Sequence, residues 1–93
     1  MHRIVISRSL TIVFLIDRAR AMHFTRLEVE LFLQLRDITG VDQASHFLTQ
    51  EVNLQRYRVK SGQITELYVI KHGNLMIGNV DQLVNKNLIL INI

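Results

Sequence analysis

The 93-residue sequence contains no cysteine, no proline and no tryptophan. Without cysteine, a disulfide scaffold, a zinc site built from thiolates and a nucleophilic thiol are all excluded. The most apolar early stretch, Leu10–Ile16, is seven residues long, whereas a membrane-spanning helix needs about 20 residues. We therefore expect no transmembrane helix and no membrane partner. The missing cysteines agree with an intracellular, cytoplasmic location.

Glycine and histidine are sparse and scattered. The four glycines stand apart from one another, so they form no phosphate-binding loop of the G-x-G-x-x-G or Walker kind. The four histidines show no H-x-x-x-H spacing, and Ser45 and His46 would diverge by about 100° on a helix. Glu28 and Glu30 are expected to be cap and surface residues. The sequence thus predicts no catalytic residue, no metal site and no cofactor, and hence a protein that is not an enzyme.

The chain is 48% hydrophobic and carries 11 Lys and Arg against 8 Asp and Glu. Apolar content this high with modest net charge argues against disorder, and the length suits one domain over residues 1–93. The charge is unevenly distributed, because residues 27–55 are mainly acidic while residues 1–26 and 56–93 are mainly basic.

The first half of the chain contains one segment with two interpretations. Residues 3–16 are typical of one long strand, or of two strands bent at Ser7–Ser9. Thr25 and Glu28 have capping-box spacing, and Gly40 is suited to end a helix, which favours a helix over 26–38. Its apolar stripe would be Leu27, Leu31, Leu35 and Ile38. However, strict alternation over residues 27–35 is also the period of a half-buried strand.

Further elements are expected along the second half. Asp42 is suited to cap a helix that runs through Gln50, followed by a turn at 51–53. Leu54 and Tyr57 lie three apart, which predicts a third helix over 54–61 with Tyr57 facing the core, although the segment is short enough to be a strand. A hairpin over 64–78 would turn at Gly73-Asn74, followed by a helix over 80–86 and a terminal strand over 88–93.

Together these elements predict a small α+β domain. It would have an N-terminal strand, two to three short helices in a helix-turn-helix-like order, and a C-terminal hairpin with a terminal strand. The alternative is a mostly β fold with one or two helices.

The basic cluster around residues 54–61 is the main candidate for function. On a helix, its polar side chains would form an array able to enter a DNA groove, with Arg and Gln contacting base edges and Lys60 and Ser61 contacting phosphates. The candidate DNA-binding residues are Gln55, Arg56, Arg58, Lys60 and Ser61. A solvated face is the alternative explanation for so short a run of cations.

Residues 25–64 resemble helix-turn-helix transcription regulators of the LuxR/GerE type or winged-helix proteins. The resemblance rests on Thr25, Glu28, Glu30, Leu31, Phe32 and Leu35 in the first helix, Leu48 in the scanning helix, Val52-Asn53 at the turn, and Arg56, Tyr57, Arg58 and Ile64 on the recognition helix. Residues 81–84 are similar to the family's closing segment. The sequence departs from the LuxR/GerE pattern at Ile38, where that family has a glycine.

Two functions follow as expectations. The first is a small transcriptional regulator that binds duplex DNA through residues 54–61. The second is a non-enzymatic interaction module that docks on a partner protein as an accessory subunit or inhibitor. A homodimer is compatible with both, because Ile4–Ile6 and Leu88–Ile93 offer apolar edges for self-association.

Overall fold

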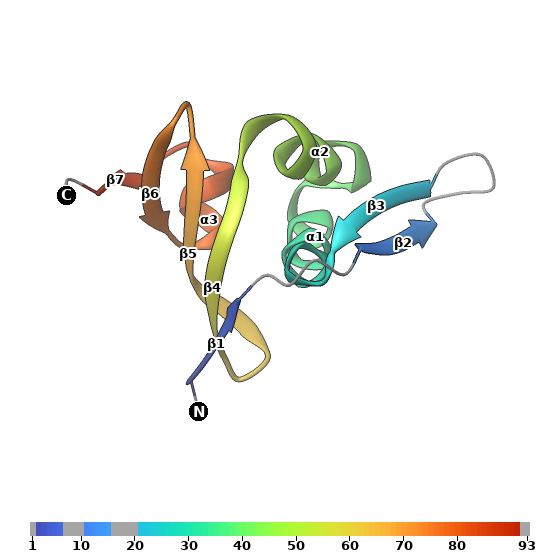
Figure 1. Cartoon of the computed structure of the whole chain (residues 1–93), viewed down its shortest axis with the longest axis horizontal. Helices are drawn as coiled ribbons and strands as arrows, with labels where there is room; N and C mark the ends of the chain where they lie inside the picture. The colour runs from blue at the N-terminus through green and yellow to red at the C-terminus, as the bar shows by residue number, and fades with distance from the viewer. Residues whose placement is uncertain (1, 7–10, 16–20, 92–93) are drawn as a thin grey trace.

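The computed structural model describes the backbone of residues 2–6, 11–15 and 21–91, and the side chains of residues 24–91. The described elements, in chain order, are β1 (His2–Ile6), β2 (Thr11–Leu15), β3 (Ala21–Thr25), α1 (Arg26–Thr39), α2 (Val41–His46), η1 (Phe47–Glu51), β4 (Asn53–Lys60), β5 (Gln63–Lys71), β6 (Asn74–Gly78), α3 (Val80–Val84) and β7 (Ile89–Leu90) (Figure 1). The predicted α+β class, with strand before helices and a hairpin after them, is confirmed.

Five strands form one antiparallel sheet in the order β1-β4-β5-β6-β7, and β2 pairs with β3 in a separate hairpin. This hairpin lies against α1, on the side away from the sheet (Figure 1). The N-terminal strand prediction is confirmed as two strands, whereas the expected bend at residues 7–9 lies outside the described residues. At the other end, β7 pairs with β6 over only two residues.

The capping box at the start of α1 settles the ambiguous segment. The Glu28 N–H donates to Thr25 Oγ1 (3.3 Å), and the Thr25 N–H donates to Glu28 Oε1 (2.9 Å). Gly40 ends the helix at φ +88°, a value that favours glycine. The helix is therefore confirmed, and the strand interpretation of residues 27–35 is wrong. The predicted stripe is buried except at Ile38, which is 53% exposed.

The second helical segment differs from its prediction at both ends. α2 begins after Gly40, which makes no side-chain capping bond, so Asp42 lies inside the helix and is not its cap. The last turn is the π-helical η1, which buries Phe47 and Leu48. The expected turn at 51–53 is also wrong, because Val52 is extended (φ −133°) and leads directly into β4.

The predicted helix over 54–61 is wrong, because these residues form β4 and the start of a hairpin turn. Leu54 is paired with Val69 and Arg56 with Tyr68, which leaves Gln55 as an extra residue in a β-bulge. The bulge lets Leu54 and Tyr57 both face the core although they lie three apart. A spacing typical of a helix thus arises from a strand, and the recognition helix implied by the resemblance is not formed by these residues.

Two tight turns connect β4, β5 and β6. Ser61 and Gly62 have φ values of +53° and +77°, and His72 and Gly73 have +54° and +77°. Two successive positive φ angles are typical of type I′ turns, whose twist matches that of paired strands. The hairpin over 64–78 is confirmed, with its turn one residue earlier than expected. Gly62 completes the first of these two turns.

The core lies between the inner face of the sheet and the helices. It is formed by Phe24, Leu27, Leu31, Phe32, Leu35, Ala44, Phe47, Leu48, Val52, Leu54, Tyr57, Val59, Ile64, Leu67, Val69, Val80 and Leu83. α3 contributes Val80 and Leu83 and begins with a second capping box, in which the Gln82 N–H donates to Asn79 Oδ1 (2.8 Å). Tyr57 faces the core as predicted, and its hydroxyl donates to Glu30 Oε2 of α1 (2.6 Å). This bond ties the first helix to the sheet.

Candidate functional site

The predicted DNA-binding residues lie on and next to β4. Side chains alternate along a strand, so Arg56, Arg58 and Lys60 point away from the core on one face, with about 6.6 Å between successive positions. Gln55 lies in the bulge, where its side-chain nitrogen donates to the Asn53 carbonyl oxygen (3.3 Å). Ser61 is the first residue of the turn. The strand therefore brings three cations into one row and leaves the other two candidates out of it.

The face of the sheet opposite the core, here called the outer face, has a cross-strand row at its centre. Arg56 is paired with Tyr68, Tyr68 with Ile77, and Ile77 with Ile89. Directly paired residues place their side chains on the same face of a sheet. The Arg56 Cζ lies 4.0 Å from the centroid of the Tyr68 ring, which is the geometry of a cation–π contact.

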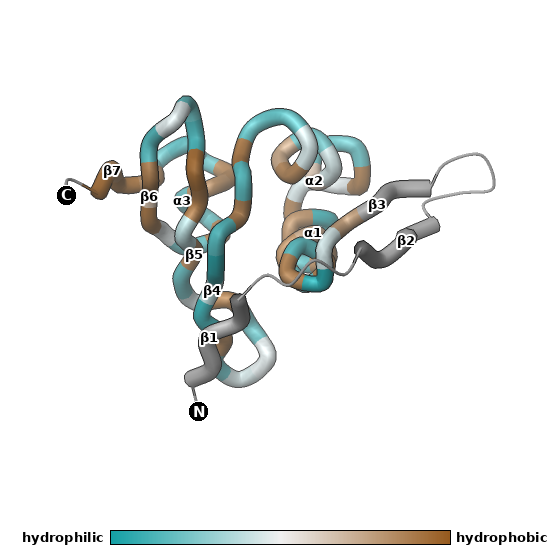
Figure 2. The backbone as a smooth tube through the Cα atoms, in the orientation of Figure 1, coloured by the Kyte–Doolittle hydropathy of each residue, from teal (hydrophilic) through white to brown (hydrophobic). Residues whose placement is uncertain are grey.

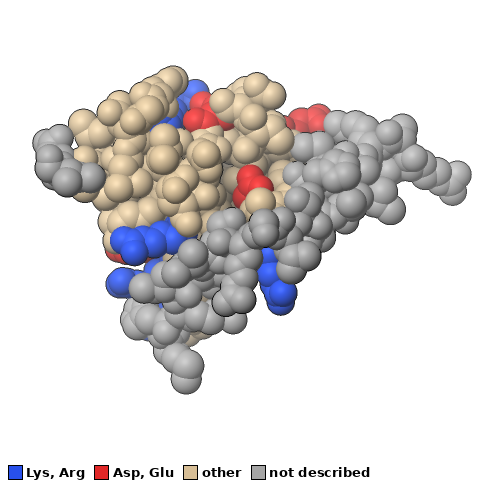
Figure 3. Space-filling model, viewed as in Figure 1, with Lys and Arg blue, Asp and Glu red and all other residues tan. Residues whose placement is uncertain are grey.

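A shorter apolar row lies beside the first, where Ile70 is paired with Leu75. Ile70 is 37% exposed and Ile89 is 58% exposed. Figure 2 shows hydrophobic backbone segments on β6 and β7 at the far edge of the sheet. The side of the molecule seen in Figure 3 is largely uncharged over the sheet, with Lys and Arg at its lower edge and a further basic group beside acidic atoms at the top. The outer face thus combines an apolar part on β5, β6 and β7 with a basic part on β4.

Glu66 is the acidic residue of this face, and it is paired with Arg58. Its Oε1 is buried and has no hydrogen-bond partner within the described part of the chain. The carboxylate reduces the positive potential around Arg58, because its negative charge lies in the cross-strand position next to that cation.

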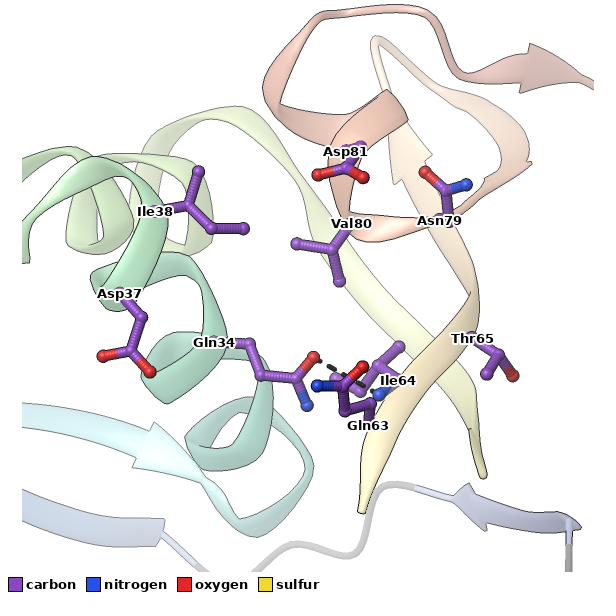
Figure 4. A pocket seen from close by; sticks show the side chains of 9 residues that line it. All are labelled: Gln34, Asp37, Ile38, Gln63, Ile64, Thr65, Asn79, Val80 and Asp81. Carbon is purple, nitrogen blue, oxygen red and sulfur yellow. Dashed lines mark hydrogen bonds between the residues drawn. The ribbon is translucent and has the colours of Figure 1, made fainter. Parts of the chain in front are cut away.

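A second feature is a groove of about 450 Å³ between α1 and α3, next to the start of β5. Figure 4 shows Ile38 of α1 and Val80 of α3 pointing towards one another across it. The Gln34 side chain crosses to β5, where its Oε1 accepts a hydrogen bond from the Ile64 N–H (3.3 Å). Asp37 and Asp81 lie on the two helical walls. Sequence analysis identified none of these residues as a site.

The adjacent pair Ser45 and His46 is not brought together by the fold. His46 Nε2 lies 3.5 Å from Glu51 Oε2, while Ser45 Oγ is buried without a hydrogen-bond partner among the described residues. Within residues 24–91, no three His, Asp or Glu side chains form a set that could hold a metal ion. No helix in the described ranges is long and apolar enough to cross a membrane.

Comparisons of the chain with models of protein families, with curated proteins and with solved structures find no match. The apolar half of the outer face was not predicted, although the sequence contains a signal for it. In the run Leu67-Tyr68-Val69-Ile70, the residues that point to each of the two faces of a strand are apolar. This pattern is typical of a strand that is covered on both faces.

Proposed function

We propose that this chain is a non-enzymatic protein-interaction module that docks on a partner protein through its outer sheet face. The observation that carries the proposal is the apolar row Tyr68, Ile77 and Ile89, which lies on the face opposite the core. Antiparallel sheets with one solvated face normally alternate apolar and polar residues. An exposed apolar patch on such a sheet is typical of an interaction surface.

The composition of the face supports a protein partner. Tyr68 and Arg56 belong to the residue types that dominate binding energy at protein interfaces, and their contact holds the two side chains together where the basic part of the face meets its apolar part. Docking would remove Ile70 and Ile89 from water, which contributes about 25 cal/mol for each Å² of apolar surface buried. An aromatic side chain, Tyr68, with aliphatic neighbours on β6 and β7 matches the organisation of an interface core.

The charges of β4 specify the partner further. Arg56, Arg58 and Lys60 line one side of the face, opposed only by Glu66 among its described residues. A complementary partner surface carries Asp or Glu beside an apolar centre. Among the described residues of its outer face, a second copy of this chain could offer only Glu66 to pair with these three cations. We therefore favour a different protein over a homodimer.

Duplex DNA is the second candidate, bound through Gln55, Arg56, Arg58, Lys60 and Ser61. The specific observation in its favour is the row of three outward cations on one strand, since cations at regular spacing can contact successive phosphates. Two features place it second. Arg56 is engaged on Tyr68, and Glu66 beside Arg58 would repel phosphate.

Site-specific photocrosslinking in cells tests the proposal. A benzophenone amino acid at Ile77 should capture a discrete protein with an acidic surface, whereas the same group at Gln50, exposed on η1, should not. Binding of the purified partner should then weaken about tenfold or more in Ile77→Ser and in the double variant Arg56→Ala/Arg58→Ala. The matched variant Gln50→Ala should bind as the native chain does.

Two results would contradict the proposal. One is equal crosslinking from Ile77 and Gln50. The other is binding of a fluorescent random-sequence duplex that falls steeply with salt and is lost in Arg56→Ala/Arg58→Ala but kept in Ile77→Ser, which would establish the DNA candidate instead. Sedimentation of the purified chain identifies a homodimer, which would make the captured protein a second copy of the chain.

A further inference from the structure

The groove between α1 and α3 has an apolar lining that is only partly covered. Ile64 and Val80 of this lining are buried, but Ile38 is 53% exposed at the end of α1. Figure 4 shows that the Ile38 and Val80 side chains face each other across the opening. An aliphatic side chain placed between them would contact both walls. The volume of about 450 Å³ lies within the range of about 300–1,000 Å³ that is usual for ligand clefts.

The charge of the groove is opposite to that of the chain. The formal net charge of the protein is +3, yet the described residues lining the groove include Asp37 and Asp81 and no cation. Among the described residues Asp37 has one weak ion pair, 3.8 Å from its Oδ1 to Arg36 Nε, and its side chain is 76% exposed. Asp81 has no ion-pair partner within the described part of the chain. The two carboxylates lie on opposite walls, so a ligand in the groove would pass between them.

Amide groups of the lining remain available for hydrogen bonds. Gln34 uses its Oε1 to accept from the Ile64 N–H, which leaves its two N–H donors without a partner among residues 24–91. The Gln63 side chain likewise has no partner in that range. Amides that both donate and accept match the alternating carbonyl and N–H groups of an extended peptide.

From these three features we propose that the groove binds an extended peptide segment of a partner protein that carries Lys or Arg beside aliphatic side chains. The aliphatic side chain fills the space between Ile38 and Val80, and the cations approach Asp37 and Asp81. This site is separate from the outer sheet face, and it requires a partner of opposite charge. The inference therefore does not depend on the proposed function.

Fluorescence anisotropy with a labelled peptide, Gly-Leu-Lys-Leu-Arg-Leu-Gly, tests the site at low salt. We expect saturable binding that weakens about tenfold in Asp37→Asn/Asp81→Asn, since two exposed ion pairs contribute modestly and are screened by salt. The matched control Asp42→Asn changes an exposed Asp on α2, outside the groove, and should leave binding unchanged. Peptides with Glu in place of the cations, or Ser in place of Leu, should bind much more weakly.

Two-dimensional NMR of the labelled chain locates the contact, with shifts expected at Ile38 and Val80. Circular dichroism of each variant checks the fold, and Ile38→Ser provides a variant that changes the apolar wall of the groove without changing charge. The proposal is overturned if the basic peptide does not bind, if Asp37→Asn/Asp81→Asn binds it as the native chain does, or if spermidine competes as well as the peptide. Ile77→Ser on the outer face should leave peptide binding intact, so the two proposals fail independently.

Discussion

The two faces of the main sheet are built from the same strands but differ in what covers them. On the inner face, Leu67 and Val69 are completely buried beneath the helices. On the outer face, their neighbours Tyr68 and Ile70 are covered by no described helix, and Ile70 remains 37% exposed. Apolar character therefore does not distinguish the two faces of β5, whereas burial does. The inner face stabilises the fold, and we assign the outer face to binding.

The largest expected difference between the faces is in the free energy of unfolding. Leu67→Ala deletes a fully buried side chain of the inner face and should destabilise the protein by about 2–5 kcal/mol, because it leaves a cavity in the core. Chemical denaturation measures the effect, and Ile77→Ala on the outer face is the matched control. Equal losses from the two variants would remove the distinction between the faces.

The next effect concerns the hydrogen bond that joins the inner face to α1. Tyr57→Phe removes the hydroxyl that donates to Glu30 Oε2 and should cost about 1–3 kcal/mol, since the bond is partly buried and its acceptor is charged. A double-mutant cycle with Glu30→Ala measures the coupling between the two side chains. Tyr68→Phe is the control, because no hydrogen bond is formed by that hydroxyl among the described residues. The prediction fails if the coupling is zero.

A smaller effect is expected for the cation–π contact of the outer face. Arg56→Ala removes the guanidinium above the Tyr68 ring and should lower stability by about 0.5–1 kcal/mol, as is usual for an exposed contact of this kind. Lys60→Ala, on the same strand but away from the ring, should have almost no effect. If both variants lose the same stability, the net charge of β4 and not the ring contact is responsible.

The elements that could be predicted from the sequence are those with local signals. The capping box of Thr25 and Glu28 and the glycine at position 40 define α1 within a few consecutive residues. The hairpin over 64–78 was likewise predictable from β-branched residues that flank a glycine turn. In these segments, local hydrogen bonds and the final tertiary contacts favour the same conformation.

β4 could not be predicted in this way, because its bulge is a property of two strands together. The extra residue, Gln55, is defined by the pairing of Leu54 with Val69 and of Arg56 with Tyr68, and residues 54–61 contain no sign of that register. The groove was missed for a related reason. Its walls at Asp37 and Asp81 come from helices far apart in the chain, and only packing brings them together.

The smallest effect on stability is expected at β7. Its two residues distinguish the binding role that we assign to the outer face from the stabilising role of the inner face. Ile89 is paired with Ile77 of the outer face, and Leu90 is paired with Met76, which packs against the core. Both side chains are about half exposed, at 58% and 49%, so Ile89→Ser and Leu90→Ser should each change the free energy of unfolding by about 0.5 kcal/mol or less. Only Ile89→Ser should weaken binding of the partner captured from Ile77, because a polar side chain at that position interrupts the apolar row. Calorimetric titration of both variants measures this difference, and equal weakening by Leu90→Ser would show that the edge strand, and not the outer face, contacts the partner.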